Sequence, residues 1–364
     1  MKKRYLGILL VIALWASLTA FAWIKPADAS SDTERRPLAQ FPECSGKTLL
    51  SGRFMREFGD YAVDQFPLRE EFRELKALYS HYVLGQKDNN GLYLHDGYAA
   101  KINYPLNENA LHYAAARFSD LYERYLKDAG GSIFFAVVPD KGLYLAPDAG
   151  VPALDYGALL ETMQTALPWA RLIDLSDTLE LSDYYRTDTH WRQAALGQTV
   201  EKLAAEMGFE ALEAAGETAV SDRFYGVYYG QAAMPMKPDA LTYITFPGWE
   251  DVTVYSADTG KTTGLYDLEK AGSRDPYELY LSGNMAVQKL TNPHADPEKK
   301  LVVFRDSFGS SLAPWLSASY GEITLLDTRY IHPAALGELA DFEGADVLFL
   351  YSTLVLNDSG SLRK

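Results

Sequence analysis

The sequence has little cysteine and a deficit of positive charge. Its only cysteine is Cys44, so an internal disulfide and a cysteine-based zinc site are both excluded. Asp and Glu number 49 against 34 Lys and Arg, which gives a formal net charge of −15 at pH 7. A surface that follows nucleic-acid phosphates needs an excess of cations, so we expect no nucleic acid among the partners. The same charge balance disfavours adhesion to anionic lipid.

What remains is the composition of an ordinary globular protein. The chain has 364 residues, of which 48% are hydrophobic and 23% are charged. These proportions argue against disorder, and the length fits one large domain or two modest ones.

One long apolar run lies near the N-terminus. The basic residues 2–4 precede an uncharged run from Tyr5 to Ile24. As a helix, this run would cover ~30 Å, the thickness of a bilayer core, whereas the apolar part of a cleaved signal peptide has only ~7–15 residues. Ala27-Asp28-Ala29 before Ser30 nevertheless resembles a cleavage site. We favour a signal anchor over 1–27 and keep a cleaved signal peptide as the alternative. Both place the remaining chain outside the cytoplasm, anchored to the cell membrane or secreted if cleaved.

The exported chain divides into a short polar segment and one domain. Residues 28–47 are polar and aperiodic, which is typical of a tether, and we assign 48–364 to a single domain. Helical spacing from about Ser51 to Leu84 is interrupted by Pro67, which predicts two helices in an N-terminal helical segment. A small hairpin is expected at 89–98, and a helix at 107–128.

The rest of the chain alternates between short apolar strands and helices. Unbroken strands separated by helices indicate a parallel sheet covered on both faces, hence an α/β fold. The expected strands are Ser132–Val138, Ala170–Leu175, Leu301–Phe304, Ile323–Leu326 and Val347–Tyr351, and the expected helices are 159–167, 191–207, 310–319 and 333–339. Residues ~215–290 are richer in Thr, Tyr and Gly, and we interpret them as an antiparallel insertion on the same sheet.

Two segments have the residue types needed for nucleophilic catalysis. Thr187-Asp188-Thr189-His190-Trp191 precedes an expected helix, and the strand at 301–304 runs into Arg305-Asp306-Ser307-Phe308-Gly309. A serine between a parallel strand and a helix lies at the carboxyl edge of the sheet, and the helix N-terminus offers backbone N–H groups to a developing oxyanion. Serine needs an adjacent base, and the base needs an orienting carboxylate. His190 and Asp188 can supply these two roles.

Simpler interpretations exist for each segment alone. Aspartate and serine are common helix caps, and a histidine beside a capping aspartate is often a surface residue. His190 and Asp188 are also potential metal ligands, but no further His or Cys lies at ligand spacing, so we predict neither a metal nor another cofactor.

Taken together, the two segments are more specific. T-D-T-H-W followed by strand–D-S-F-G–helix resembles the SGNH-hydrolase-like proteins of the alginate O-acetylation type, and more closely the related group named for its D-H-H-W motif. The resemblance extends over about Phe54–Tyr351. It includes NNGLYLHDGY at Asn89–Tyr98, VVPDKGLYL at Val137–Leu145, YLSGN at Tyr280–Asn284 and LLDTRYI at Leu325–Ile331.

The resemblance implies a catalytic triad of Ser307, His190 and Asp188, on an SGNH-hydrolase-like fold. Two departures are visible: Thr189 stands where the name of the group has its second histidine, and Arg305 stands where typical esterases have the glycine of G-D-S. Gly283-Asn284 is similar to the glycine–asparagine block that donates to the oxyanion. We therefore assign Asn284, Gly283, Phe308 and Arg305 to oxyanion or substrate binding.

The function that these features predict is serine-dependent acetyl transfer to or from a hydroxyl of a cell-envelope or exopolysaccharide. Expected partners are a glycan substrate, the cell membrane and a membrane acyl-donor protein. A carbohydrate esterase, in which water accepts the acyl group, is one alternative. A non-catalytic glycan-binding surface protein that retains the fold is another.

Overall fold

The computed structural model describes residues 2–211 and 216–363, which form two compact units. Unit 1 contains the chain up to Asn90 and the segment Tyr229–Pro235, and unit 2 contains Gly91–Tyr228 and Met236–Lys364. The division between the two units falls after Asn90. The reason is that the side chains of 64–89 bond to residues 28–36 and 230–232.

Unit 1 is built from helices and very short strands. None of the residues in its apolar run Tyr5–Ile24 is buried, and the run is long enough to cross a membrane or to act as a signal sequence. The predicted break at Pro67 is found, because one helix ends at Asp64 and the next begins at Arg69. The elements are α1 Lys2–Ile24, β1 Ser30–Ser31, β2 Arg36–Pro37, α2 Gly46–Leu50, α3 Arg53–Asp64, α4 Arg69–Tyr82 and β3 Asp88–Asn89. From the later sequence, the part of α9 (Val227–Ala232) that begins at Tyr229 also belongs to this unit.

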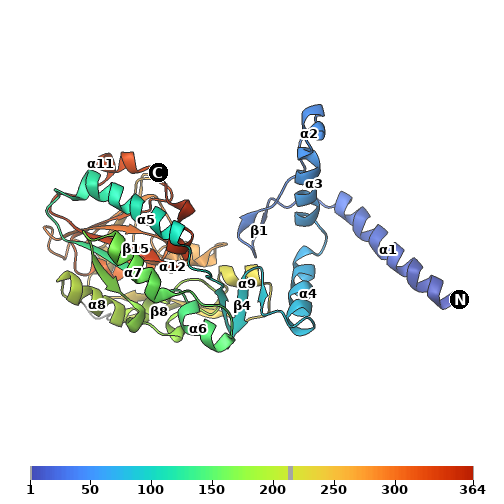
Figure 1. The fold of residues 1–364 in the computed structure, drawn as a ribbon, viewed down its shortest axis with the longest axis horizontal. Coiled ribbons are helices and arrows are strands. Elements are labelled where there is room, and N and C mark those ends of the chain that lie inside the picture. The colour runs from blue at the N-terminus through green and yellow to red at the C-terminus, as the bar shows by residue number, and fades with distance from the viewer. Residues whose placement is uncertain (1, 212–215, 364) are drawn as a thin grey trace. The chain divides into compact units, whose positions relative to one another are not determined.

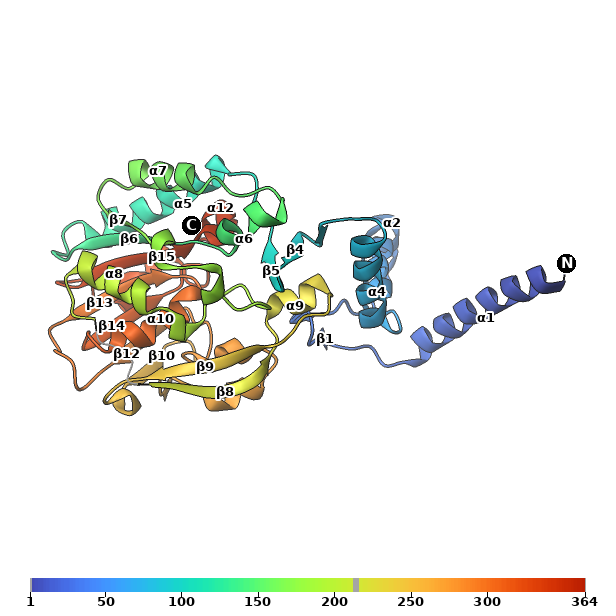
Figure 2. The same ribbon diagram turned by 90° about the horizontal axis from the view of Figure 1, so that it is seen from below.

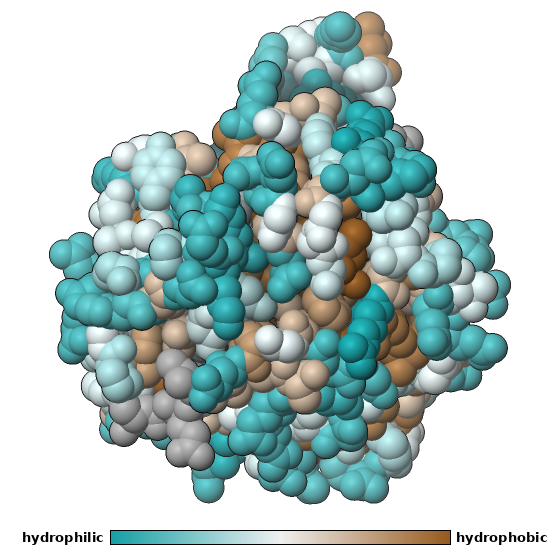
Figure 3. All heavy atoms as spheres, turned by 90° about the vertical axis from the view of Figure 1, so that its left-hand side faces the viewer, coloured by the Kyte–Doolittle hydropathy of each residue, from teal (hydrophilic) through white to brown (hydrophobic). Residues whose placement is uncertain are grey.

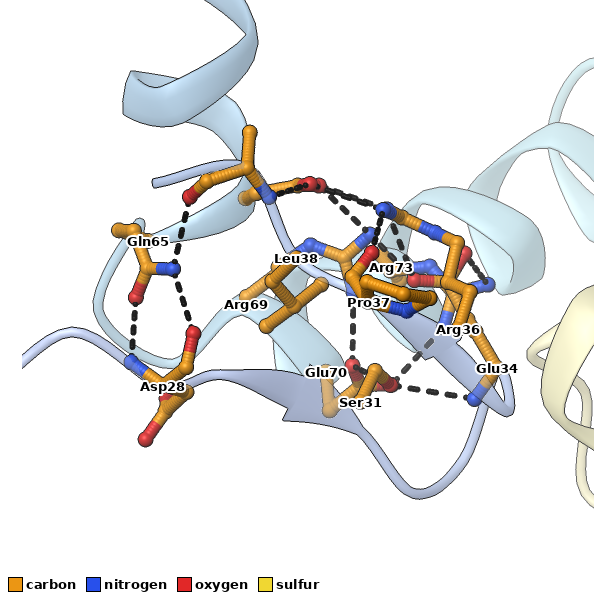
Figure 4. Close-up of polar contacts among 12 residues, drawn as sticks. Asp28, Ser31, Glu34, Arg36, Pro37, Leu38, Gln65, Arg69, Glu70 and Arg73 are labelled. Carbon is orange, nitrogen blue, oxygen red and sulfur yellow. Dashed lines mark hydrogen bonds and ion pairs between the residues drawn. The ribbon is translucent and has the colours of Figure 1, made fainter. Parts of the chain in front are cut away.

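The polar segment that follows α1 is bound to α3 and α4, as Figure 4 shows. Arg36 forms two hydrogen bonds to the Asp64 carboxylate, at 2.8 and 2.6 Å. Gln65 bonds both backbone groups of Asp28, accepting from its N–H at 2.8 Å and donating to its carbonyl at 2.9 Å. The expected tether at 28–47 is thus partly ordered, because its polar groups find partners at the α3–α4 junction.

Unit 2 is organised around an eight-stranded sheet, ordered β11-β10-β12-β14-β13-β15-β6-β7. The five strands from β14 to β7 run parallel, with Leu301 of β13 opposite Ile323 of β14 and Asp346 of β15. The strands are β6 Ile133–Val138, β7 Arg171–Asp174, β10 Thr253–Ser256, β11 Lys261–Thr263, β12 Val287–Thr291, β13 Lys300–Arg305, β14 Glu322–Leu326 and β15 Asp346–Ser352. The mainly parallel α/β sheet predicted from the sequence is confirmed.

The antiparallel insertion is divided between two places. β10, β11 and β12 extend the main sheet in antiparallel fashion beside β14, as predicted. β8 (Gly216–Phe224) and β9 (Asp239–Thr245) instead pair only with each other. The small hairpin expected at 89–98 is found as β4 (Leu92–His95) and β5 (Tyr98–Lys101).

Helices cover both faces of the sheet (Figures 1 and 2). Alternate residues of each strand enter two different cores, so that Val303 packs with residues of α8 and α10 whereas Val302 packs with residues of α5 and α7. The helices are α5 Glu108–Leu121, α6 Gly142–Ala149, α7 Tyr156–Ala166, α8 Gly197–Met207, α10 Phe308–Ser317, α11 Leu336–Leu339 and α12 Thr353–Asn357. Most of the face drawn in Figure 3 is hydrophilic.

One helix begins later than predicted. The helix expected over 191–207 starts at Gly197, because Trp191 forms a β-bridge with Tyr184 and Gln193–Ala195 is a 3-10 turn. His190 therefore lies in a loop that the bridge between Tyr184 and Trp191 closes, and this loop does not directly precede a helix.

Candidate active site

The second motif segment lies at the centre of the carboxyl edge of the parallel sheet. β13 ends at Arg305, and α10 begins at Phe308. From β13 the chain passes to β14 on one side and then to β15 on the other side. Such a reversal of strand order opens a crevice in open α/β sheets, and ligands bind there. Ser307 is positioned at this point.

Ser307, His190 and Asp188 form one hydrogen-bonded chain. Ser307 Oγ lies 2.7 Å from His190 Nε2, and His190 Nδ1 lies 2.6 Å from Asp188 Oδ1. With the proton of neutral imidazole on Nδ1, Nε2 accepts from the serine hydroxyl. Ser307 does not cap α10 with its side chain. The alternative that Ser307 serves as a helix cap is therefore wrong.

The Asp188 carboxylate is held by backbone donors. Its Oδ1 accepts from the N–H of His190 at 3.1 Å, and its Oδ2 accepts from the N–H of Val227 at 2.8 Å. Gly226 allows this approach, because a Cβ at that position would lie 2.2 Å from Asp188 Cβ. Asp188 is 1% exposed, so its orientation is set by protein groups and not by water.

A second buried carboxylate fixes the loop before Asp188. Asp239 accepts from the N–H groups of Arg186 and Thr187 at 2.8 and 2.9 Å, and from the Thr187 hydroxyl at 2.6 Å. Thr187 Oγ1 in turn accepts from the N–H of Gly226 at 2.9 Å. Asp239 was not predicted from the sequence, because it lies about fifty residues further along the chain, at the start of β9.

The imidazole is held on its faces by aromatic rings. The ring of Tyr277 stacks on His190 with a centroid separation of 3.8 Å, and Phe308 packs against it at 4.9 Å. Tyr277 Oη donates to Ser311 at 2.9 Å, and burial raises its pKa well above the usual range. Trp191 also donates to Ser311, at 2.9 Å. Phe308, expected to bind substrate, instead packs in the core around the histidine.

A buried lysine lies behind the loop. Lys141 donates to the carbonyls of Tyr185 and Arg186, at 2.7 and 3.4 Å, and is 2% exposed. Burial lowers its pKa to about 7, although the carboxylates of Asp188 and Asp239 favour its charged form. Lys141 lies in the VVPDKGLYL segment, but we predicted no role for it from the sequence.

The donors available to an oxyanion differ from those expected. The N–H of Phe308 donates to Asp306 Oδ1 at 3.0 Å, and the N–H of Gly283 donates to the Tyr280 carbonyl at 3.1 Å. These two groups are already used because each stabilises its own turn. Within residues 2–211 and 216–363, the Ser307 N–H and the Asn284 side-chain amide have no protein acceptor.

Arg305 is fully buried, so it cannot contact substrate and instead positions neighbouring residues. Its guanidinium donates to Asn284 Oδ1 at 2.7 Å and to Gln288 Oε1 at 2.9 Å. Gln288 donates onward to the Leu281 carbonyl at 2.6 Å. Residues 281–283 all have positive φ, a strained backbone that needs such support. The assignment of Arg305 to substrate contact is therefore corrected: it is 0% exposed and positions the loop that carries Asn284.

Comparisons with known proteins identify the fold. No protein-family model matches the chain, and no curated protein matches it. A DHHW family protein from Eubacterium siraeum is 19% identical with a TM-score of 0.59, over 76% of this chain and 95% of that one. Bacillus cereus PatB1, in its structure with a sulfonyl adduct, shares 19% sequence identity with this chain. The match has a TM-score of 0.59 and covers 75% of this chain and 98% of PatB1. The resemblance to DHHW-type proteins is thus confirmed at the level of the fold.

Proposed function

We propose that this chain is an extracytoplasmic acyltransferase that uses Ser307 to move an acetyl group between a donor and a hydroxyl of a cell-envelope polysaccharide. The observation that carries the proposal is the hydrogen-bonded chain from Ser307 through His190 to Asp188, at 2.7 and 2.6 Å. These distances lie within the range needed for proton transfer between a nucleophile and its base.

The first half of the reaction forms an acyl-enzyme. Ser307 Oγ attacks the carbonyl carbon of the donor ester, and its proton passes to His190 Nε2. Asp188 stabilises the imidazolium and keeps the ring in place. The tetrahedral oxyanion accepts hydrogen bonds from the Ser307 N–H and the Asn284 amide. As the intermediate collapses, the leaving oxygen takes the proton from His190.

The second half regenerates the serine. A sugar hydroxyl attacks the acyl carbon, His190 removes its proton, and the Ser307–acyl bond breaks with return of that proton to Oγ. If water attacks instead, the enzyme is an esterase. The two reactions differ in how well water is excluded from the acyl-enzyme. The resemblance to the O-acetylation type favours transfer, and the N-terminal apolar helix favours action at the outer side of a membrane.

The test is to follow the acyl group. Incubation with an activated acetyl ester should add one acetyl mass to the chain, and oligosaccharide acceptors should remove it as acetylated sugar. Ser307→Ala should give no adduct, whereas Ser319→Ala, just beyond α10, should behave as the parent chain. A sulfonyl fluoride should also label Ser307, since PatB1 was solved with a sulfonyl adduct. Failure of both reagents to modify Ser307 would favour a glycan-binding role without turnover.

A further inference from the structure

α4 presents a continuous apolar stripe to solvent. The stripe repeats at intervals of three and four residues, which at 100° per residue places its members within an arc of about 80°. Their exposed fractions run from 44% at Phe72 to 74% at Tyr82. The members, called the α4 stripe below, are Phe72, Leu75, Tyr79 and Tyr82, and Leu68, which directly precedes α4, is exposed as well. Met55 and Val63 of α3 are also exposed, at 65% and 67%.

The side of α4 away from the stripe is already occupied. Ala77 and Ser80 are buried, and Arg73 forms ion pairs with Glu34 and Glu70 at 3.2 and 2.8 Å. The stripe is therefore an additional apolar face and not the side by which α4 packs in unit 1. Exposed apolar surface of this extent usually has an occupant.

The chain itself places this face beside the membrane. The apolar run ends at Ile24, and only four residues later both backbone groups of Asp28 are bonded to Gln65. Four extended residues span at most ~14 Å. Asp28, to which Gln65 at the α3–α4 junction is hydrogen-bonded (Figure 4), therefore lies within that distance of Ile24.

The charges near the stripe do not select an anionic surface. Arg69 pairs with Glu34 at 2.5 Å and with Glu70 at 2.8 Å, and the exposed residues Glu71 and Glu74 add negative charge. Tyrosines 79 and 82 combine an apolar ring with a hydroxyl, which suits the boundary between headgroups and acyl chains. A cavity of about 660 Å³ adjoins the stripe at Phe72. Ala62, Val63 and Phe66 form its apolar wall, and the rest of its lining is polar or charged, with Arg69, Arg73 and Lys76 among it.

We propose that α4 lies in the interface of the bilayer that α1 spans, with the α4 stripe sunk among the lipid acyl chains. The occupant of the stripe is the lipid surface itself, held by apolar burial and not by headgroup charge. The proposal rests on α1 as a membrane span, and it is independent of the reaction at Ser307. The second contact would restrict how the juxtamembrane unit tilts on its single anchor.

The test uses the full chain in phosphatidylcholine vesicles. Cys44, the exposed free cysteine, is replaced in Cys44→Ser, and an environment-sensitive dye is attached through Leu75→Cys or, as the matched control, Glu74→Cys. These neighbours are both exposed but point about 100° apart. We expect blue-shifted emission and quenching by nitroxide lipids at position 75, and neither at 74. A dye attached through Ala16→Cys should report the interior of the bilayer.

Several results would overturn the proposal. Equal, water-like emission at 74 and 75 would show that the stripe does not enter lipid. A blue shift at 75 without quenching by nitroxide lipids would mean that protein covers the stripe, either a second copy or a partner. Quenching that appears only with anionic lipids would refute the apolar mode of binding. A water-exposed dye at position 16 would remove the premise that α1 spans the bilayer.

Discussion

Arg305 donates to the amide oxygen of Asn284 at 2.7 Å while remaining completely buried. Because the buried guanidinium binds Oδ1 of Asn284, the orientation of the amide is fixed from inside the protein. Burial lowers the pKa of Arg305, and the nearby carboxylates of Asp327 and Asp306 favour its charged form. The arginine that interrupts the G-D-S pattern thus holds the side chain of Asn284 in one orientation.

The first prediction concerns this alignment. Asn284→Ala should lower kcat by about 10²- to 10³-fold, the usual cost of a lost oxyanion donor. Arg305→Lys, which keeps a cation at the site, should lower kcat by part of that factor and leave KM nearly unchanged. In the Asn284→Ala background, Arg305→Lys should have no further effect on kcat. Steady-state kinetics of the two single variants and the double variant would check this. Additive losses would show that Arg305 does not act through Asn284.

The nucleophile is tested by removing one oxygen atom. Ser307→Ala should abolish acetyl transfer, because no other group in the chain of hydrogen bonds can form the ester. Its free energy of unfolding should change by no more than about 1 kcal/mol, since in the part of the chain that the structure describes the hydroxyl forms a single hydrogen bond, to His190. Turnover assays and urea unfolding measure the two quantities. Full activity in this variant would remove Ser307 from the mechanism.

Features that depend on residues close together in the sequence were predicted, whereas features that depend on distant segments were not. The strand, turn and helix around Ser307 were predictable because β13 is a short apolar run and α10 follows it directly. The pairing of His190 with Ser307, 117 positions apart, was accessible only because two motifs together resembled a known family. Local patterning alone left capping and surface roles open for both segments.

The remaining features depend on packing between distant segments. Nothing near Tyr277 in sequence indicates that its ring stacks on His190, because that contact depends on how the loop after β11 folds over the sheet. Phe308 and Gly283 were assigned to oxyanion or substrate binding, whereas local turns satisfy the N–H groups of both residues. The burial of Arg305 was missed for the opposite reason: arginine is usually exposed, and it enters a core only where several acceptors converge.

Asp188 is expected to control the orientation and tautomer of His190. Asp188→Asn should lower kcat by about 10⁴-fold, because an amide in this position favours the imidazole tautomer that cannot accept the serine proton. The histidine would stay in place, since Tyr277 and Phe308 hold its faces. Kinetics with an activated ester would measure the loss. A similar substitution at an exposed acid, Asp222→Asn, serves as the control, and an unchanged rate in Asp188→Asn would reduce the aspartate to a structural role.

Lys141 should make stability depend on pH above neutrality. Burial lowers its pKa from 10.5 to about 7 in the folded chain, so between these values the unfolded chain binds more protons. The contribution of Lys141 to the free energy of unfolding therefore rises with pH over this range. The cost of burying the ammonium is present in full below pH 7 and is relieved as the pH approaches 10.5.

Lys141→Met should remove this contribution to the slope of the free energy of unfolding against pH. The substitution also leaves the carbonyls of Tyr185 and Arg186 without their donor and so lowers stability overall. The slope, and not the absolute stability, is therefore the informative quantity. Urea unfolding at pH 7, 8 and 9 would compare the parent chain, Lys141→Met and the exposed control Lys261→Met. Parallel slopes for the parent and Lys141→Met would mean that the buried ammonium keeps its proton throughout, as the carboxylates of Asp188 and Asp239 favour.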